Sequence, residues 1–126
     1  MLKLQTEFLD HGVFQRNAQG FCRTCLSFTG ANPKGRVKAF YHNGTGSEEQ
    51  PAGETVADEF GTGRLPLSAI PVGGPYTVRI LEKECMVAAI TDILVGDVWL
   101  LAGQSNMSGC GKLSEAEIPS DKVRCF

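Results

Sequence analysis

The 126-residue sequence contains no apolar run of the roughly 18 residues needed to cross a bilayer. Its twelve basic residues stand against fourteen acidic ones, so it lacks the positive excess typical of nucleic-acid-binding domains. Residues 1–10 show neither the apolar core nor the small-residue cleavage site of a signal peptide. These absences predict a cytoplasmic protein with no membrane partner and no nucleic-acid partner.

Histidine is scarce, with two residues, and the five cysteines are an odd number. An odd count without a secretory signal predicts reduced thiols rather than a disulfide framework. Cys22 and Cys25 form a Cys-x-x-Cys pair, but alternation along a strand turns these two side chains to opposite faces. We therefore predict neither zinc nor a disulfide at this pair, and no metal or cofactor elsewhere.

Turn-forming residues are abundant, with 15 Gly and 6 Pro. Between them lie short segments in which apolar and polar residues alternate, which is typical of half-buried strands. The alternation predicts strands within residues 20–28, 37–41, 76–80 and 86–90, with shorter candidates at 55–60 and 64–67. About five to seven short strands at this spacing predict an antiparallel β-sandwich over residues 1–92.

The pattern changes at residues 98–102, Val-Trp-Leu-Leu-Ala, which are apolar at every position. Continuous apolar patterning is typical of a strand buried on both faces, as in the parallel sheet of an α/β domain. We therefore predict a boundary near 93–96 and a strand at 97–102. Residues 93–126 are then the start of an α/β domain, cut short at residue 126.

The apolar segment ends in Gly103, Gln104, Ser105 and Asn106. A nucleophilic serine suits the carboxyl end of a buried strand, where a tight turn exposes its Oγ and a following helix offers N–H groups to an oxyanion. Gly103 permits such a turn, although the common Gly-x-Ser-x-Gly elbow is not matched. The alternative is a serine that caps a helix. Gly103, Gln104 and Asn106 are candidate binding residues of this turn.

Residues 95–107, VGDVWLLAGQSNM, resemble the first block of the sialate O-acetylesterase family. These are serine esterases of the SGNH-hydrolase superfamily, with a flavodoxin-like α/β domain, that act on acetylated sugars. Residues 10–16 resemble the family's N-terminal motif, 73–76 the segment before the last sandwich strands, and 109–126 the route to the next strand. The resemblance implies that Ser105 is the nucleophile and that its backbone N–H is one oxyanion donor. It also implies an O-acetylated sugar as substrate and no cofactor.

The general base of that family is a histidine in an Asp-x-x-His block, and this sequence has no such block. Its two histidines, His11 and His42, lie in the predicted sandwich, and neither is expected to be the base. The glycine and asparagine that supply the family's other oxyanion donors belong to later blocks, so Asn106 is not that asparagine.

Two hypotheses therefore stay open. In the first, the chain is the N-terminal part of a carbohydrate O-acetylesterase, inactive by itself and able to self-associate through the uncovered α/β strand. In the second, it is a non-catalytic β-sandwich module with a packing or sugar-binding role.

Overall fold

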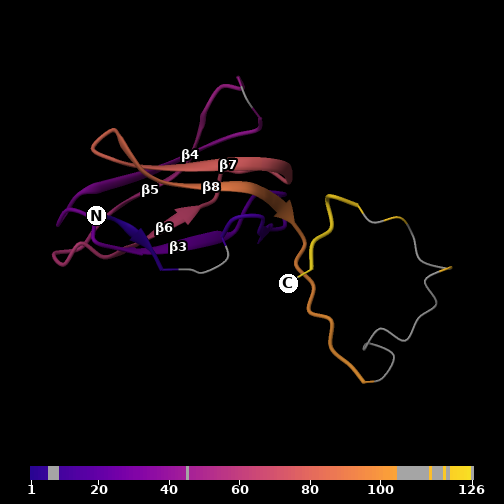
Figure 1. The fold of residues 1–126 in the computed structure, drawn as a ribbon. Coiled ribbons are helices and arrows are strands. Elements are labelled where there is room, and N and C mark those ends of the chain that lie inside the picture. The colour runs from indigo at the N-terminus through magenta and orange to yellow at the C-terminus, as the bar shows by residue number, and fades with distance from the viewer. Residues whose placement is uncertain (6–8, 45, 105–113, 115–117, 119, 126) are drawn as a thin grey trace.

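A computed structural model describes residues 1–5, 9–44, 46–104, 114, 118 and 120–125 of the chain. The described residues form eight β-strands and no α-helix, so the predicted mainly β fold is confirmed. The strands build two sheets, which Figure 1 shows as two layers. In this part of the chain, no helix is long and apolar enough to cross a membrane.

The smaller sheet comprises β1 (Lys3–Leu4), β3 (Thr24–Thr29) and β6 (Gly63–Leu67), in that order. The larger sheet has the order β2 (Val13–Gln15), β8 (Cys85–Gly96), β7 (Gly73–Glu82), β4 (Arg36–His42) and β5 (Gln50–Val56). All pairings are antiparallel except that between β2 and β8, which is parallel.

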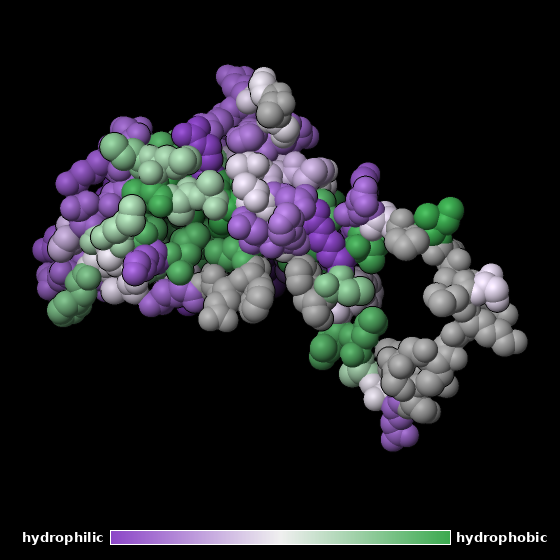
Figure 2. All heavy atoms as spheres, viewed as in Figure 1, coloured by the Kyte–Doolittle hydropathy of each residue, from purple (hydrophilic) through white to green (hydrophobic). Residues whose placement is uncertain are grey.

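The hydrophobic core lies between the two sheets. Side chains alternate across a strand, so one face of each strand can be apolar while the other faces solvent. The predicted alternation is confirmed in the buried residues Leu26, Phe28, Val37, Ala39, Leu65, Leu67, Val78, Ile80 and Ile90, whereas Met86, expected on the same face as Ile90, is 56% exposed. Figure 2 shows hydrophobic side chains along the seam between the layers, and others on the segment that leaves the sandwich.

Two predicted strands, at 20–28 and 55–60, overlap the observed strands only in part. Regular pairing in the first begins at Thr24, since Phe21 and Cys22 form only isolated bridges. The candidate at 55–60 is wrong beyond Val56, because Asp58 closes a turn in which its Oδ1 accepts the N–H groups of Phe60 and Thr62. An aspartate that bonds to nearby backbone favours a turn over a strand, and it leaves Phe60 86% exposed.

The predicted strand at 97–102 is not observed. β8 continues to Gly96, past the expected sandwich limit at residue 92, and the chain then leaves the sheet. Its apolar side chains are exposed: Val98 by 57%, Trp99 by 78%, Leu100 by 92% and Leu101 by 76%. A strand exists only when a neighbouring strand takes up its backbone hydrogen bonds, and the described residues offer no such neighbour to 99–102.

Glu82, at the end of β7, is the one charged residue of the described part that is buried, at 8% exposure. Its Oε1 accepts the backbone N–H of Asn32 at 2.5 Å and so holds the turn between β3 and β4. Desolvation raises the pKa of Glu82. The hydrogen bond from Asn32 and the positive charges of Lys83 and the N-terminus act against it and leave the pKa below its ordinary value.

We predict that Glu82→Gln lowers the free energy of unfolding at pH 7 by about 1–2 kcal/mol, because an amide oxygen accepts a weaker hydrogen bond than a carboxylate. The pKa of Glu82 is lower in the folded state, so this contribution is present above the unfolded pKa and is lost as pH falls through the folded pKa. Urea unfolding at pH 7 and at pH 3 checks both parts. Glu54→Gln, at an exposed position of β5, is the control, and a difference independent of pH would contradict the prediction.

Candidate functional site

Three segments that lie far apart in the sequence meet at the last third of β8. Residues 10–16 run beside residues 91–98 on one side, and residues 73–76 lie on the other side. Residues 10–16 and 73–76 are the two upstream segments that carry the family resemblance, and residues 95–98 begin its block at 95–107. The paired Cα positions are Val13 with Leu94, Phe14 with Val95, Gln15 with Gly96, Gly73 with Val95, and Tyr76 with Ile93.

The beginning of this contact is a corner built from Asp10, His11, Thr91 and Asp92. Asp10 Oδ1 accepts the Thr91 N–H at 2.7 Å and its hydroxyl at 3.2 Å, while the His11 N–H donates to the Thr91 carbonyl at 3.0 Å. His11 and Asp92 both have left-handed backbone, with φ of 63° and 57°. Residues other than glycine rarely adopt this conformation, so the surrounding hydrogen bonds must hold it in place.

Side chains at this corner form a chain of charge-assisted contacts. His11 Nδ1 lies 2.6 Å from Asp92 Oδ2, and Arg124 Nη2 donates to Asp92 Oδ1 at 2.7 Å. Arg124 Nη1 also donates to the backbone carbonyl of Asp92. The hydrogen bonds from His11 and Arg124 lower the pKa of Asp92. Arg124 thus ties residues near the end of this sequence to the sandwich.

The contacts of the two histidines can be compared with those of the general base in serine hydrolases. Asp92 engages Nδ1 of His11, whose side chain is 70% exposed, and a carboxylate on Nδ1 is what orients a general base in serine hydrolases. His42, at the end of β4, instead contacts the Gly44 carbonyl through Nδ1 at 2.7 Å. Ser105 lies outside the described residues, and the expectation that neither histidine is the base stays a prediction.

The other end of the contact holds the exit of β8. The Arg16 N–H donates to the Gly96 carbonyl at 2.9 Å, and Arg16 Nε donates to Asp97 Oδ1 at 2.9 Å. The Val98 N–H donates to Gln15 Oε1 at 3.0 Å. These bonds set the position from which the chain departs toward the predicted nucleophile turn.

The structure describes two of the four predicted turn residues. Ser105 and Asn106 lie outside the described residues. Gly103 and Gln104 are described and exposed, beyond the sheet. The structure therefore contains the segment leading to the turn and leaves the turn itself a prediction.

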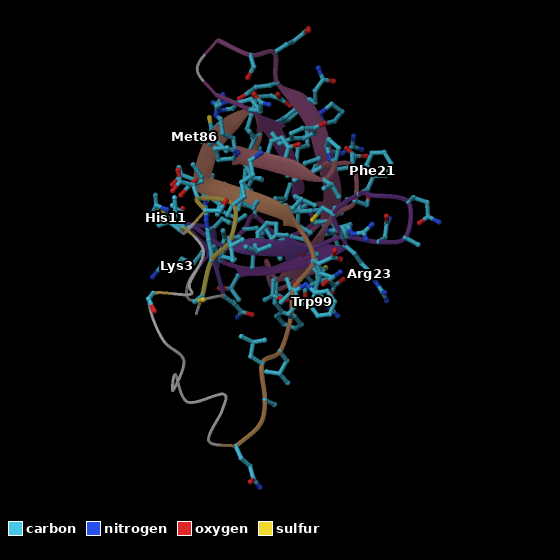
Figure 3. All side chains as sticks on the ribbon, turned by 90° about the vertical axis from the view of Figure 1, so that its right-hand side faces the viewer. Lys3, His11, Phe21, Arg23, Met86 and Trp99 are labelled. Carbon is cyan, nitrogen blue, oxygen red and sulfur yellow. The ribbon has the colours of Figure 1, made fainter. Side chains whose placement is uncertain are left out.

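A groove of about 780 Å³ opens beside the exit of β8, within the size range of small-molecule sites. Its wall contains two arginines and no acidic residue, and one of the two, Arg16, is paired with Asp97. Figure 3 shows Phe21 and Arg23 on one side of the molecule, His11 and Lys3 on the other, and Trp99 nearer the middle. The groove is lined by Arg16, Asn17, Ala18, Gln19, Cys22, Arg23, Thr24, Cys25, Pro66, Leu67 and Ser68.

The cysteine pair has the orientation that alternation predicts. Cys22 is 1% exposed and packs in the core, where burial raises the pKa of its thiol, whereas Cys25 is exposed. Cys22, Cys25, Cys85 and Cys125 are free thiols. The described residues contain no group of three or more side chains that could hold a metal ion.

Sequence reasoning missed Gln15, Arg16, Asp92 and Arg124 as parts of this site. The opposite charges of Arg16 and Asp97 were a possible signal, but the two residues are 81 positions apart. Only the parallel pairing of β2 with β8 makes them neighbours.

Comparison of the chain with protein-family models finds no match, and a search of curated proteins finds none either.

We predict that Arg124→Gln raises the pKa of Asp92 toward its ordinary value, because the carboxylate loses a hydrogen bond and a positive charge. The pKa of Asp92 is lower in the folded state. Any stability that the contacts of Asp92 provide is therefore present above the pKa that Asp92 has in the unfolded chain. It is lost as pH falls through the lower pKa that Asp92 has in the folded state. An NMR titration of the Asp92 carboxyl carbon measures the shift. Arg16→Gln, at the other end of β2, is the control, and an unchanged titration in Arg124→Gln would contradict the bond.

Proposed function

We propose that this chain supplies the β-sandwich and the nucleophile segment of a carbohydrate O-acetylesterase, with Ser105 as the nucleophile. The observation that carries this proposal is that residues 10–16 and 73–76, two of the motifs, flank the end of β8, where the block at 95–107 begins. A chance likeness of separate short motifs gives no reason for them to be neighbours. A shared origin does, because the N-terminal motif and the nucleophile block then form one structural unit.

The proposed reaction is acyl transfer to serine. The Ser105 hydroxyl attacks the acetyl carbonyl, a tetrahedral oxyanion forms, and the sugar alcohol leaves; water then attacks the acetyl-enzyme and releases acetate. The backbone N–H of Ser105 stabilises the oxyanion as one of its donors. The proposal places the base, with its Asp-x-x-His block, and the remaining oxyanion donors in residues that this sequence does not contain.

The exposed apolar segment at residues 98–101 supports the proposal that the remaining catalytic residues belong to a further part of an α/β domain. Val98, Trp99, Leu100 and Leu101 are each more than half exposed, and apolar surface in water costs about 25 cal/mol per Å². A segment that is apolar at every position is stabilised when it is covered on both faces, as in a parallel sheet. Further strands of an α/β domain would provide that cover. Without them, a second copy of the chain is the expected substitute.

The alternative is a sugar-binding module without catalysis. The groove beside β8 favours it, because the groove joins arginines and neutral polar groups to an apolar wall, and Trp99 lies exposed just after the end of β8. Aromatic faces with polar groups around them are common in ligand sites. This alternative needs binding of a sugar by the chain and no part for Ser105.

We predict that the 126-residue chain hydrolyses p-nitrophenyl acetate no faster than its Ser105→Ala variant, because serine without a base is a weak nucleophile. A natural form that carries an Asp-x-x-His block beyond residue 126 should be active. In that form Ser105→Ala should lower kcat by a factor on the order of 10⁶, since members of a catalytic triad act as a unit. Ser120→Ala is the matched control.

The outcomes separate the hypotheses. Serine-dependent turnover by the short chain would show that a base exists within these residues. An intact mass and sequence of the natural protein that contain no such block would refute the esterase. Sugar binding that survives Ser105→Ala, in a protein without esterase activity, would support the binding module.

A further inference from the structure

The parallel ladder between β2 and β8 ends in an irregular rung. In a parallel pair, every second residue of a strand forms two hydrogen bonds with the partner strand, one through its N–H and one through its carbonyl. These bonds are evenly spaced along the pair. Here the Leu94 N–H donates to the Gly12 carbonyl at 3.0 Å, and the Arg16 N–H donates to the Gly96 carbonyl at 2.9 Å. The same spacing makes the Arg16 carbonyl the next acceptor, for the N–H of Val98.

That direct bond is replaced by the side chain of Gln15. The Val98 N–H donates to Gln15 Oε1 at 3.0 Å, and Gln15 Nε2 donates to the Arg16 carbonyl at 3.0 Å. One side-chain amide is therefore inserted between the donor and the acceptor that a continued ladder would join. Both backbone groups stay satisfied, so the insertion leaves no unpaired donor or acceptor at this rung.

The insertion has a geometric consequence. Two hydrogen bonds in series span more than the single bond of a regular rung, which holds neighbouring strands about 4.8 Å apart. Residues 97–98 must therefore diverge from the line of β2. The ion pair between Arg16 and Asp97 fixes the divergent chain from a second point.

We propose that Gln15 is a positioning residue that ends the sandwich ladder and directs the segment carrying Ser105 out of this sheet, with Arg16 holding that direction through Asp97. The importance of this for catalysis rests on the proposed function. The inserted rung itself does not, because it concerns only residues 15–16 and 96–98.

The chemistry of glutamine is specific to this role. The rung needs one donor and one acceptor on the same short group, which a side-chain amide provides. A carboxylate can accept from Val98 but cannot donate to the Arg16 carbonyl. Alanine at position 15 does neither, and it lets the Arg16 carbonyl take the Val98 N–H directly, which extends β8 along β2.

NMR can identify the acceptor of the Val98 N–H, because scalar coupling passes through a hydrogen bond from the amide nitrogen to the carbonyl carbon. In the 126-residue chain, the expected coupling joins Val98 N to the side-chain Cδ of Gln15. In Gln15→Ala it should move to the backbone carbonyl carbon of Arg16. Trp99 is the only tryptophan, so its fluorescence emission and anisotropy report the direction of the segment independently. Both should change in Gln15→Ala while the urea midpoint of unfolding stays the same.

Three comparisons make the result decisive. Gln19→Ala, at an exposed glutamine of the next turn, should leave both Trp99 signals unchanged. Gln15→Asn, whose shorter side chain cannot span the rung, should behave as Gln15→Ala and serves if alanine lowers the unfolding midpoint. Asp97→Asn should lower Trp99 anisotropy without moving the Val98 coupling.

Coupling from Val98 directly to the Arg16 carbonyl in the unaltered chain would overturn the proposal, as would Trp99 signals that are the same in Gln15→Ala, Gln15→Asn and the parent. These readouts need no esterase activity. Failure of the inserted rung is therefore distinguishable from failure of the esterase proposal, which is decided by Ser105 in the natural protein.

Discussion

The second pairing partner that β8 gains near its end is the constraint on which the rest of the structure depends. This strand pairs antiparallel with β7 as far as Val95, and from Leu94 it also pairs in parallel with β2. Between Ile90 and Ile93 the register with β7 shifts at a bulge in which Asp92 adopts left-handed backbone. Bulges bend a strand and change the direction of its side chains, so this one decides where β8 leaves the sandwich and what it leaves beside.

Glycine makes the close approach of the third segment possible. Gly74 lies against β8 with φ of 118°, and a Cβ at this position would lie 2.5 Å from the Ile93 carbonyl oxygen. An amino acid with a side chain would be strained at this backbone angle and would collide with that carbonyl oxygen, so only glycine fits here. On the opposite edge, the short strand β2 follows the corner at Asp10 and His11, whose contacts with Thr91 and Asp92 hold the chain against β8. The end of β8 is thus enclosed from both sides by backbone rather than by large side chains.

Local alternation was sufficient to predict the two-sheet core. Val37, Ala39, Val78 and Ile80 are buried because their strands follow a strict period of two. It could not predict the turn at Asp58, where a side chain competes with strand pairing, nor the parallel contact of β2 with β8. That contact joins residues 81 positions apart through an edge strand of three residues, which is too short to carry a periodic signal.

The candidate site shows the same division between local and distant information. The resemblance at 95–107 rests on contiguous residues, whereas the partners that hold the first part of this block, Gln15 and Arg16, come from the other end of the chain. The apolar residues 98–102 were expected to form a buried strand, and they are exposed because burial depends on partners rather than on composition. A segment that is held firmly at residues 96–98 and is uncovered immediately afterwards has a fixed origin and an open apolar surface. Fixing the start of such a segment would lower the entropy lost if, as proposed, a further sheet strand or a second copy of the chain paired with it.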